Sequence, residues 1–196
     1  MIKRLFDILF SIVMLLLLSP LLLSMVVIVA LDSPGGVFFG QIRVGKSGRH
    51  FRLWKFRTMK VNAESSGQLT VGSRDNRITR AGFYLRKYKI DELPQLWNVL
   101  TGDMSIVGPR PEVPRYVAMY NEEQKQVLSI LPGITDYASL LYFTENDLLA
   151  ASSNPEDTYI REIMPAKLEL NLKYIREMSF LGDMKIVLLT ARRIFR

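Results

Sequence analysis

The sequence predicts a mainly helical α+β protein that carries an apolar membrane segment near its N-terminus. Three observations support this fold class. Residues 8–31 form an apolar run without a charged side chain. Residues 37–39 and 51–56 have the composition of short strands. Several later segments repeat apolar residues at helical spacing. We therefore expect residues 1–32 to form a membrane segment and residues 33–196 to form a globular domain.

Length, charge and residue usage narrow the classes of partner and site. The 196 residues are enough for one domain with a substantial core. A net charge of +7 favours an anionic partner, such as nucleic acid, anionic lipid or a phosphorylated substrate. The chain has no cysteine, which excludes disulfides and thiolate metal sites. Its single histidine, His50, excludes a histidine cluster, so zinc chemistry is not expected.

The apolar run is long enough to cross a bilayer, but Ser19 and Pro20 interrupt it near its middle. Proline removes a helical hydrogen bond and clashes with the preceding turn. Both flanks of the run are basic, starting with Lys3 and Arg4, so the positive-inside rule gives no orientation. The residues alone leave two alternatives: a hairpin that returns to the same side, and a kinked span. A cleaved signal peptide fits poorly, because no cleavage site is evident after Leu31.

The two strand-like segments flank a loop at residues 45–48 and predict a small hairpin. Alternation places Lys55 on the same face as Phe51 and Leu53. Neither face of this strand is cleanly polar, so we expect Lys55 or Arg57 to point into a site. Basic residues interleaved with aromatic ones also occur in nucleic-acid-binding proteins, but no such binding motif accompanies them here. Nucleic acid is therefore not an expected partner.

Two adjacent carboxylates, Asp91 and Glu92, directly precede an apolar pattern at helical spacing. Pro94 suits the first turn of that helix, where its missing N–H has no cost. Cationic residues crowd the upstream side, namely Arg77, Arg80, Arg86, Lys87 and Lys89. A carboxylate pair at the positive end of a helix in this setting can hold a divalent metal and handle phosphate. The alternative is that both are ordinary cap and first-turn acids.

A second candidate is Arg110, which two prolines enclose after Gly108. Its backbone has little freedom, and a pre-organised guanidinium suits bidentate recognition of phosphate. The alternative is a rigid exposed turn whose arginine has no role.

The remaining segments are predicted from composition and spacing. Residues 60–76 are polar and indicate a loop over a site, and residues 78–88 indicate a short helix. Residues 114–130 predict one helix, whereas residues 137–149 cannot be assigned. Residues 184–196 predict a basic amphipathic helix, which either lies among lipid headgroups or packs on the core.

Taken in order, these landmarks resemble the monotopic phosphoglycosyl transferases, the bacterial sugar transferase family that primes glycan assembly. Each motif alone is weak, whereas their order and spacing together are specific. The chain resembles the small, catalytic-core form of the family. The residues that carry the resemblance are Ser19, Pro20, Phe39, Gln41, Arg43, Gly45, Gly48, Arg86, Asn98, Ser179, Phe180 and residues 55–59, 91–96, 102–105, 108–111, 132–135 and 183–185.

For the fold, the resemblance implies a re-entrant membrane helix broken at Ser19 and Pro20, and it favours the hairpin over the kinked span. It implies a globular part on the cytoplasmic face of the bacterial inner membrane. A small β-hairpin and interfacial amphipathic helices would surround the active site there. The lipid bilayer is therefore an expected partner.

For the chemistry, the resemblance implies transfer of a phospho-sugar from a UDP-sugar to polyprenol (undecaprenyl) phosphate, with release of UMP. This is the first membrane step in making capsule, O-antigen, exopolysaccharide or glycoprotein glycans. Asp91 would attack the sugar-bearing phosphate and form a phosphoryl-aspartate. Mg²⁺ is the expected cofactor, held by Asp91 and Glu92. Phosphate contacts are expected from Arg86, Arg110, Lys55 and Arg57.

Two positions depart from the family pattern: Asp136 stands where glycine is usual, and Asn171 where aspartate is common. Both lie in regions implicated in nucleotide-sugar recognition, so the sugar stays open. Two other functions remain as alternatives. A non-enzymatic, membrane-anchored basic module would bind anionic lipid under the control of salt and would not need Asp91. A membrane phosphatase would use the same aspartyl chemistry with water as the final acceptor.

Overall fold

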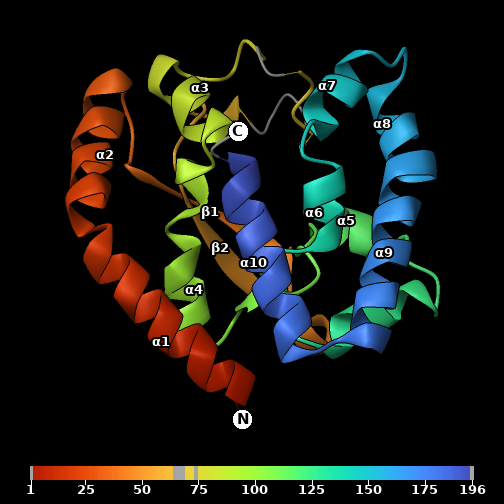
Figure 1. Ribbon diagram of the computed structural model, residues 1–196. Coiled ribbons are helices and arrows are strands. Elements are labelled where there is room, and N and C mark those ends of the chain that lie inside the picture. Colours follow the sequence, from red (N-terminus) through yellow and green to blue (C-terminus); the bar gives the residue numbers. More distant parts are fainter. Residues whose placement is uncertain (1, 64–68, 73–74, 195–196) are drawn as a thin grey trace.

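The computed structural model describes residues 2–63, 69–72 and 75–194 (Figure 1). Its helices are α1 (Ile2–Leu17), α2 (Ser19–Asp32), α3 (Arg80–Lys87), α4 (Gln95–Thr101), α5 (Pro114–Val117), α6 (Tyr137–Leu141), α7 (Glu145–Ala150), α8 (Pro155–Thr158), α9 (Met164–Glu177) and α10 (Phe180–Ile194). Short 3-10 or π segments are η1 (Lys46–Gly48), η3 (Ile90–Glu92), η4 (Gln124–Ser129) and η5 (Tyr159–Ile163). The strands are β1 (Phe38–Val44), β2 (His50–Phe56), β3 (Ser105–Val107) and β4 (Gly133–Thr135). The predicted class, mainly helical α+β with a small hairpin, is confirmed.

Helices α1 and α2 are bent by 64° relative to each other, where the sequence predicted a break. Pro20 has no N–H to donate to the Leu16 carbonyl, and the Ser19 hydroxyl donates to that carbonyl instead, over 2.8 Å. Among the described helices, none alone is long and apolar enough to cross a membrane. The bent pair together meets that test by length and composition, as a broken span or a re-entrant loop.

The first half of α1 is fastened to the globular part by polar contacts. Asp7 is buried, and its carboxylate accepts hydrogen bonds from the Ser105 hydroxyl over 2.8 Å and the Ile106 N–H over 3.1 Å. Arg4 donates to two carbonyls at the end of α4, over 2.6 and 3.1 Å, where the helix dipole favours a cation. These contacts therefore hold the N-terminal half of α1 against the globular part. The predicted domain boundary at residues 32 and 33 stays a prediction.

Strands β1 and β2 form the predicted antiparallel hairpin, with Phe38 opposite Phe56 and Val44 opposite His50. β1 is longer than expected and extends to Val44. The connecting loop turns through Ser47 and Gly48, which have φ values of 56° and 76°. The hairpin directs Lys55 toward the interior of the globular part, as the next section describes.

Helix α4 holds the hairpin beside the carboxylate pair. The buried Asn98 side chain accepts from the Trp54 N–H over 3.0 Å and donates to the Arg52 carbonyl over 2.8 Å. The helix begins after Pro94 and ends at Gly102, whose φ of 93° suits glycine. The helix predicted after the carboxylates is thus confirmed.

Strands β3 and β4 form a parallel pair that we did not predict, because three-residue strands give no periodic signal. The Gly108 N–H donates to the Thr135 carbonyl over 3.1 Å, and the Gly133 N–H donates to the Pro109 carbonyl over 3.0 Å. A Cβ on Gly133 would lie 2.1 Å from the Gly108 nitrogen. The close approach of these two glycines therefore sets the start of the loop that presents Arg110.

The prediction of one helix over residues 114–130 is wrong, since the structure has α5 and η4 there. Between them, Asn121 and Gln124 cap each other: each side-chain oxygen accepts the backbone N–H of the other, over 2.8 and 3.0 Å. Reciprocal capping satisfies the free N–H groups of a new helix start. This local interaction outweighs the apolar spacing that predicted a continuous helix.

The buried side chains form two main clusters on either side of the globular part. One is rich in tyrosine and includes Tyr116, Tyr159 and Leu168. The other, mostly aliphatic, includes Val99 and Ile186 together with partly buried side chains of α1. Residues 137–149, which the sequence left unassigned, form α6 and α7. The predicted C-terminal helix is confirmed as α10, which starts earlier, at Phe180.

Candidate active site

A cavity of about 450 Å³ brings together five of the six side chains proposed for metal, phosphate or catalysis. Its lining includes Lys55, Arg86, Asp91, Glu92 and Arg110. Side chains of the tyrosine-rich cluster and of the aliphatic cluster both line it as well. The volume falls within the range of about 300–1,000 Å³ that is usual for small-molecule sites.

The carboxylate pair lies on η3, one short turn before α4. Lys89 precedes it with a φ of 56°, a conformation that non-glycine residues adopt uncommonly. This sharp turn buries both acids, leaving Asp91 4% and Glu92 8% exposed. The sequence therefore placed the pair correctly, just before a helix. Burial to this depth is unusual for ordinary cap residues, which lie at the surface.

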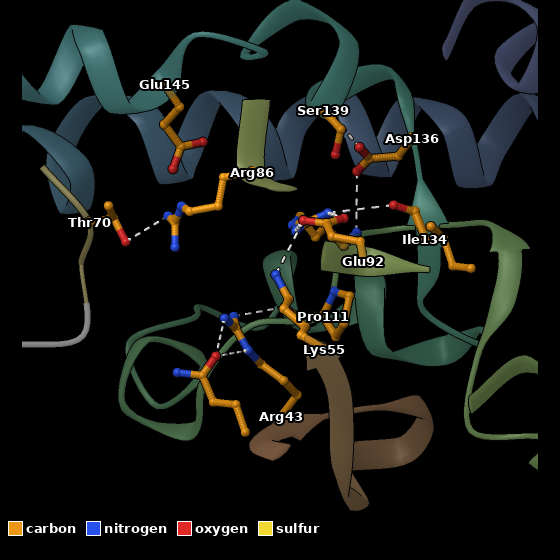
Figure 2. Close-up of polar contacts among 12 residues, drawn as sticks. Arg43, Lys55, Thr70, Arg86, Glu92, Pro111, Ile134, Asp136, Ser139 and Glu145 are labelled. Carbon is orange, nitrogen blue, oxygen red and sulfur yellow. Dashed lines mark hydrogen bonds and ion pairs between the residues drawn. The ribbon is translucent and has the colours of Figure 1, made fainter. Parts of the chain in front are cut away.

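Glu92 is the centre of a cluster of charged side chains that line the cavity (Figure 2). We call the part of the cavity lined by Lys55, Asp91, Glu92 and Arg110 the cavity floor. Arg110 donates to both of its oxygens, one of them over 3.0 Å, and Lys55 donates to Oε1 over 3.2 Å. Burial alone would raise the pKa of Glu92, but the charges of Arg110 and Lys55 hold that pKa well below its usual value. Glu92 is therefore ionised and in turn raises the pKa of Arg110. Burial lowers the pKa of Lys55 to about 8, although Glu92 acts in the opposite direction.

Asp91 has a different environment from its neighbour. Its Oδ1 atom is buried and has no hydrogen-bond partner among the described residues. Burial raises the pKa of the Asp91 carboxyl, the charge of Lys55 opposes that rise, and the charge of Glu92 adds to it. A buried carboxylate oxygen without a partner is costly, so such an atom in a cavity is available to a cation or an electrophile.

Arg86 lines the cavity from the last turn of α3. It donates to the Thr70 hydroxyl over 3.0 Å, and Figure 2 shows it pointing toward Thr70 and Glu145. Thr70 belongs to the predicted loop over residues 60–76, so the described part of that loop reaches the cavity. Residues 64–68 and 73–74 of the loop lie outside the described residues.

Within the described part of the chain, Arg57 stands apart from the other predicted site residues. Its guanidinium donates to the carbonyls of Val29, Ser33, Pro34 and Gly36 and to the Ser33 hydroxyl. These acceptors belong to the C-terminal end of α2 and the turn after it. Arg57 therefore fastens the end of the apolar helix pair in this structure and is not in the cavity lining.

The cavity also contains an ionic network that the sequence analysis did not identify. Arg43 donates to Glu112 over 3.0 Å, and the Tyr159 hydroxyl donates to the other Glu112 oxygen. Burial raises the pKa of Tyr159, and the charge of Glu112 adds to that rise, so the hydroxyl stays protonated. The sequence signal that could have pointed to this network is the position of Glu112, two residues after Arg110. Its partners could not be inferred, because Arg43 and Tyr159 lie far from it in the chain.

Of the two departures from the family pattern, Asn171 lines the cavity, whereas Asp136 lies outside the lining and contacts the backbone of Arg110. Asp136 is fully buried; one of its oxygens accepts the Ser139 N–H over 2.6 Å, and the other accepts the Arg110 N–H over 3.2 Å. It thus caps α6 and holds the Arg110 backbone. Asn171 lines the cavity, and its Oδ1 is buried without a partner among the described residues, as is Ser139 Oγ.

The chain matches the bacterial sugar transferase family over residues 1–196. It belongs to that family. The chain is 40% identical to the UDP-N-acetylgalactosamine-undecaprenyl-phosphate N-acetylgalactosaminephosphotransferase of Aeromonas hydrophila, over 98% of this chain and 43% of the relative. It is 39% identical to the UDP-glucose:undecaprenyl-phosphate glucose-1-phosphate transferase of Escherichia coli (strain K12), over 97% of this chain and 39% of the relative.

A third relative, the uncharacterized sugar transferase EpsL of Bacillus subtilis (strain 168), is 39% identical over 98% of this chain and 86% of its own length. The bacterial sugar transferase chain thus spans about two fifths of the first two relatives and most of the third. The family resemblance expected from the sequence is confirmed.

The residues at the cavity floor fit a metal ion only in part. Asp91 offers a buried oxygen without a partner, which suits Mg²⁺. Both oxygens of Glu92, the other predicted ligand, accept hydrogen bonds from Arg110 and Lys55 in this structure. Over the described ranges, no three acidic, histidine or cysteine side chains cluster as a ready-made metal site. Because Mg²⁺ commonly binds one or two carboxylates together with substrate phosphates, Asp91 alone meets the requirement on the protein side.

Proposed function

We propose that this protein transfers a phospho-sugar from a UDP-sugar to undecaprenyl phosphate and releases UMP, which starts the assembly of a bacterial glycan. Two of the relatives reported above are named for an activity between a UDP-sugar and undecaprenyl phosphate. The observation that carries the proposal is the buried, unpartnered Oδ1 of Asp91 on a cavity floor lined by cations.

In the first step, an Asp91 oxygen attacks the phosphorus that bears the sugar. The bond from that phosphorus to the bridging oxygen breaks, and UMP leaves with that oxygen. An ionised carboxylate suits this role because it forms a reactive acyl phosphate. Burial raises the pKa of Asp91, and the charge of Lys55 favours the ionised form against that rise. In the second step, an oxygen of the lipid phosphate attacks the same phosphorus. The bond to Asp91 breaks, which returns the carboxylate and leaves a lipid diphosphate-sugar.

Both steps bring two anions together, so neutralisation of charge dominates the barrier. Arg110 and Lys55 are paired with Glu92 before substrate arrives, which keeps their orientation fixed. Diphosphate oxygens would share these donors with Glu92, while Arg86 contacts the donor phosphates from the other side of the cavity. Mg²⁺, when bound by Asp91 and phosphate oxygens, would neutralise further charge on the diphosphate.

For the membrane, we propose that α1 and α2 enter one leaflet and return to the same face. The globular domain would then lie on the cytoplasmic face of the inner membrane. The bend of 64° at Ser19 and Pro20 supports a re-entrant hairpin. Most side chains exposed on both helices are apolar, including Leu9 at 54% and Leu23 at 68%, which suits acyl chains better than water.

The test is release of UMP from a panel of UDP-sugars, with and without undecaprenyl phosphate and Mg²⁺. Wild type should release about one UMP per enzyme from the right donor alone and should sustain release only with lipid and metal, and Asp91→Asn should lose about 10³-fold or more in turnover. Asp147→Asn, the same change at an exposed site on α7, should behave as wild type. UMP release that survives Asp91→Asn would reject the nucleophile. Release of free sugar phosphate without lipid would favour the phosphatase, and no release from any donor would favour the binding module.

A further inference from the structure

Helices α1 and α10 touch at one end and diverge from there (Figure 1). At the closed end, Lys3 forms an ion pair with Asp183 over 2.5 Å. Beside this pair, the Phe6 ring meets the Phe180 ring edge-on, with centroids 5.5 Å apart. From these contacts α1 runs toward α2, while α10 runs to the C-terminus across the front of the view in Figure 1.

The cavity extends into the space between the two diverging helices. Phe10 and Met14 line it from α1, and Val187, Ala191 and Ile194 line it from α10. We name this part of the cavity, defined by these five side chains, the α1–α10 cleft. All five are apolar, and Leu93, two residues after Asp91, also lines the cavity. Thr190 lines it from α10 as well, with its hydroxyl hydrogen-bonded to the Thr135 hydroxyl and the Ile186 carbonyl. The cleft is therefore an apolar arm of the same cavity that holds the proposed nucleophile.

The outer faces of both helices continue the apolar character of the cleft. On α1, Leu9 and Val13 are 54% and 59% exposed and neighbour Phe10 and Met14 in the chain. On α10, Leu188 is 71% exposed, next to Val187. Apolar side chains thus lie on the outside of both helices as well as in the cleft. UDP and a free sugar gain little from such surroundings, whereas the hydrocarbon chain of a lipid does.

Positive charge lies at the same side of the cavity. Lys89 Nζ and the Arg193 guanidinium each lie over the Phe143 ring, 5.4 and 5.3 Å from its centroid. Both Lys89 and Phe143 line the cavity, and Arg193 lies next to Ile194 of the cleft. An apolar arm with cations beside it matches a long hydrocarbon chain that ends in phosphate.

We propose that the α1–α10 cleft binds the first isoprene units of the polyprenyl phosphate acceptor, with the lipid entering between α1 and α10. This inference rests on the proposed function, because it assigns the acceptor of that reaction. The opposite wall of the cavity carries Tyr116, Tyr120 and the Glu112 network, whose hydroxyl and ionic groups suit the nucleotide-sugar. The two substrates therefore approach Asp91 from different sides.

The variant that tests the cleft is Ala191→Trp, which places a large ring in it at a position that is exposed and tolerates bulk. The matched control is Leu188→Trp, on the outer face of the same helix. In Ala191→Trp, the KM for undecaprenyl phosphate should rise about tenfold or more, while the rapid release of UMP from donor alone stays unchanged. Leu188→Trp should keep the acceptor KM within about twofold of wild type. An acceptor KM unchanged in Ala191→Trp would overturn the proposal.

A second measurement does not depend on catalysis. A geranylgeranyl phosphate carrying a terminal benzophenone is crosslinked by light to the wild-type, full-length chain, and the labelled peptides are mapped. Labels on α1 and α10, reduced in Ala191→Trp, would support the cleft even if no donor released UMP and the proposed function failed. Labels confined to α5 and α9, on the tyrosine wall, would overturn it even if the transferase reaction were demonstrated.

Discussion

The cavity floor holds a partly buried arginine, Arg110, and the turn after α2 holds a buried one, Arg57, and the two are used in opposite ways. On the cavity floor, Arg110 donates to the carboxylate of Glu92. At the turn after α2, Arg57 donates to carbonyls and one hydroxyl of residues 29–36. Neutral carbonyls that belong to the local backbone cannot leave Arg57 unless the turn opens. An anionic partner can be replaced by another anion, so only the first arrangement suits a substrate phosphate.

The difference also bears on the prediction that both residues contact phosphate, because only Arg110 lines the cavity; its phosphate contact stays a prediction. Both arginines lie in basic, motif-like surroundings, and both were proposed as phosphate contacts. What separates them is the charge of the partner, which comes from distant parts of the chain. Changes to Arg110 or its partner Glu92 should therefore affect catalysis, whereas changes to Arg57 should affect stability.

The largest effect after loss of Asp91 is expected for Glu92→Gln, which makes the partner of Arg110 neutral, as the partners of Arg57 are. Arg110 and Lys55 would lose the charge that holds them in place, and kcat should fall about 10²–10³-fold. The thermal midpoint should fall as well, because the amide NH₂ would face a donor of Arg110 or Lys55 and both cations would lose their counter-charge, so kcat is compared per folded molecule. UMP release by Glu92→Gln at the wild-type rate would mean that this carboxylate is not part of the machinery.

Arg110→Lys should have the next largest effect. Lysine keeps the charge but cannot form the paired contacts that Arg110 makes with Glu92, so donor kcat/KM should fall about 10–100-fold. The matched change Arg57→Lys should leave kcat per folded molecule at the wild-type value. Steady-state UMP release by the two purified variants makes this comparison, and equal losses of activity would break the distinction between the regions.

Arg57→Lys should instead lower the free energy of unfolding by about 2–3 kcal/mol, because several charge-assisted hydrogen bonds to the α2 turn are lost together. Urea titration in detergent, compared with Arg110→Lys, measures the difference. The result would count against the role of Arg57 as a fastener if both variants unfolded at the wild-type urea concentration.

The smallest effect is expected for Asp136→Asn. One amide oxygen can still cap α6, but the amide NH₂ would face the Arg110 N–H, which needs an acceptor. Stability should fall by about 1 kcal/mol, and donor KM should rise only a few-fold. Ser139→Ala is the control, because it leaves both backbone hydrogen bonds of Asp136 in place; an equal rise in donor KM there would contradict the role of Asp136.

Local signals in the sequence predicted much of the site. The carboxylate pair, the helix after it and the hairpin that carries Lys55 all depend on neighbouring residues, such as Pro94 and Gly102, and the structure has them where expected. The fold class followed from the same kind of signal. The family resemblance implied that Lys55, Arg86 and Arg110 gather around the carboxylate pair. Local signals could not show this, because the three residues come from separate elements.

The features that sequence reasoning missed depend on contacts between distant residues or on very short elements. The Arg43, Glu112 and Tyr159 network joins three segments whose individual patterns indicate nothing. The parallel pair of β3 and β4 is visible only once Gly108 and Gly133 meet. Asp136 appeared only as a departure from a pattern, and its two backbone hydrogen bonds give the reason for it.

The burial of Asp7 has a consequence for the order of events during synthesis. Its two hydrogen-bond donors, Ser105 and Ile106, lie 98 and 99 positions later in the chain. At a translation rate of about 5–20 residues per second, the donors emerge from the ribosome roughly 5–20 s after Asp7. Until then water is the only partner of this carboxylate, and an unpaired charge resists entry into hydrocarbon. With the re-entrant hairpin that we propose, we therefore expect the nascent N-terminal helix to stay at the membrane surface until Ser105 and Ile106 have been synthesised.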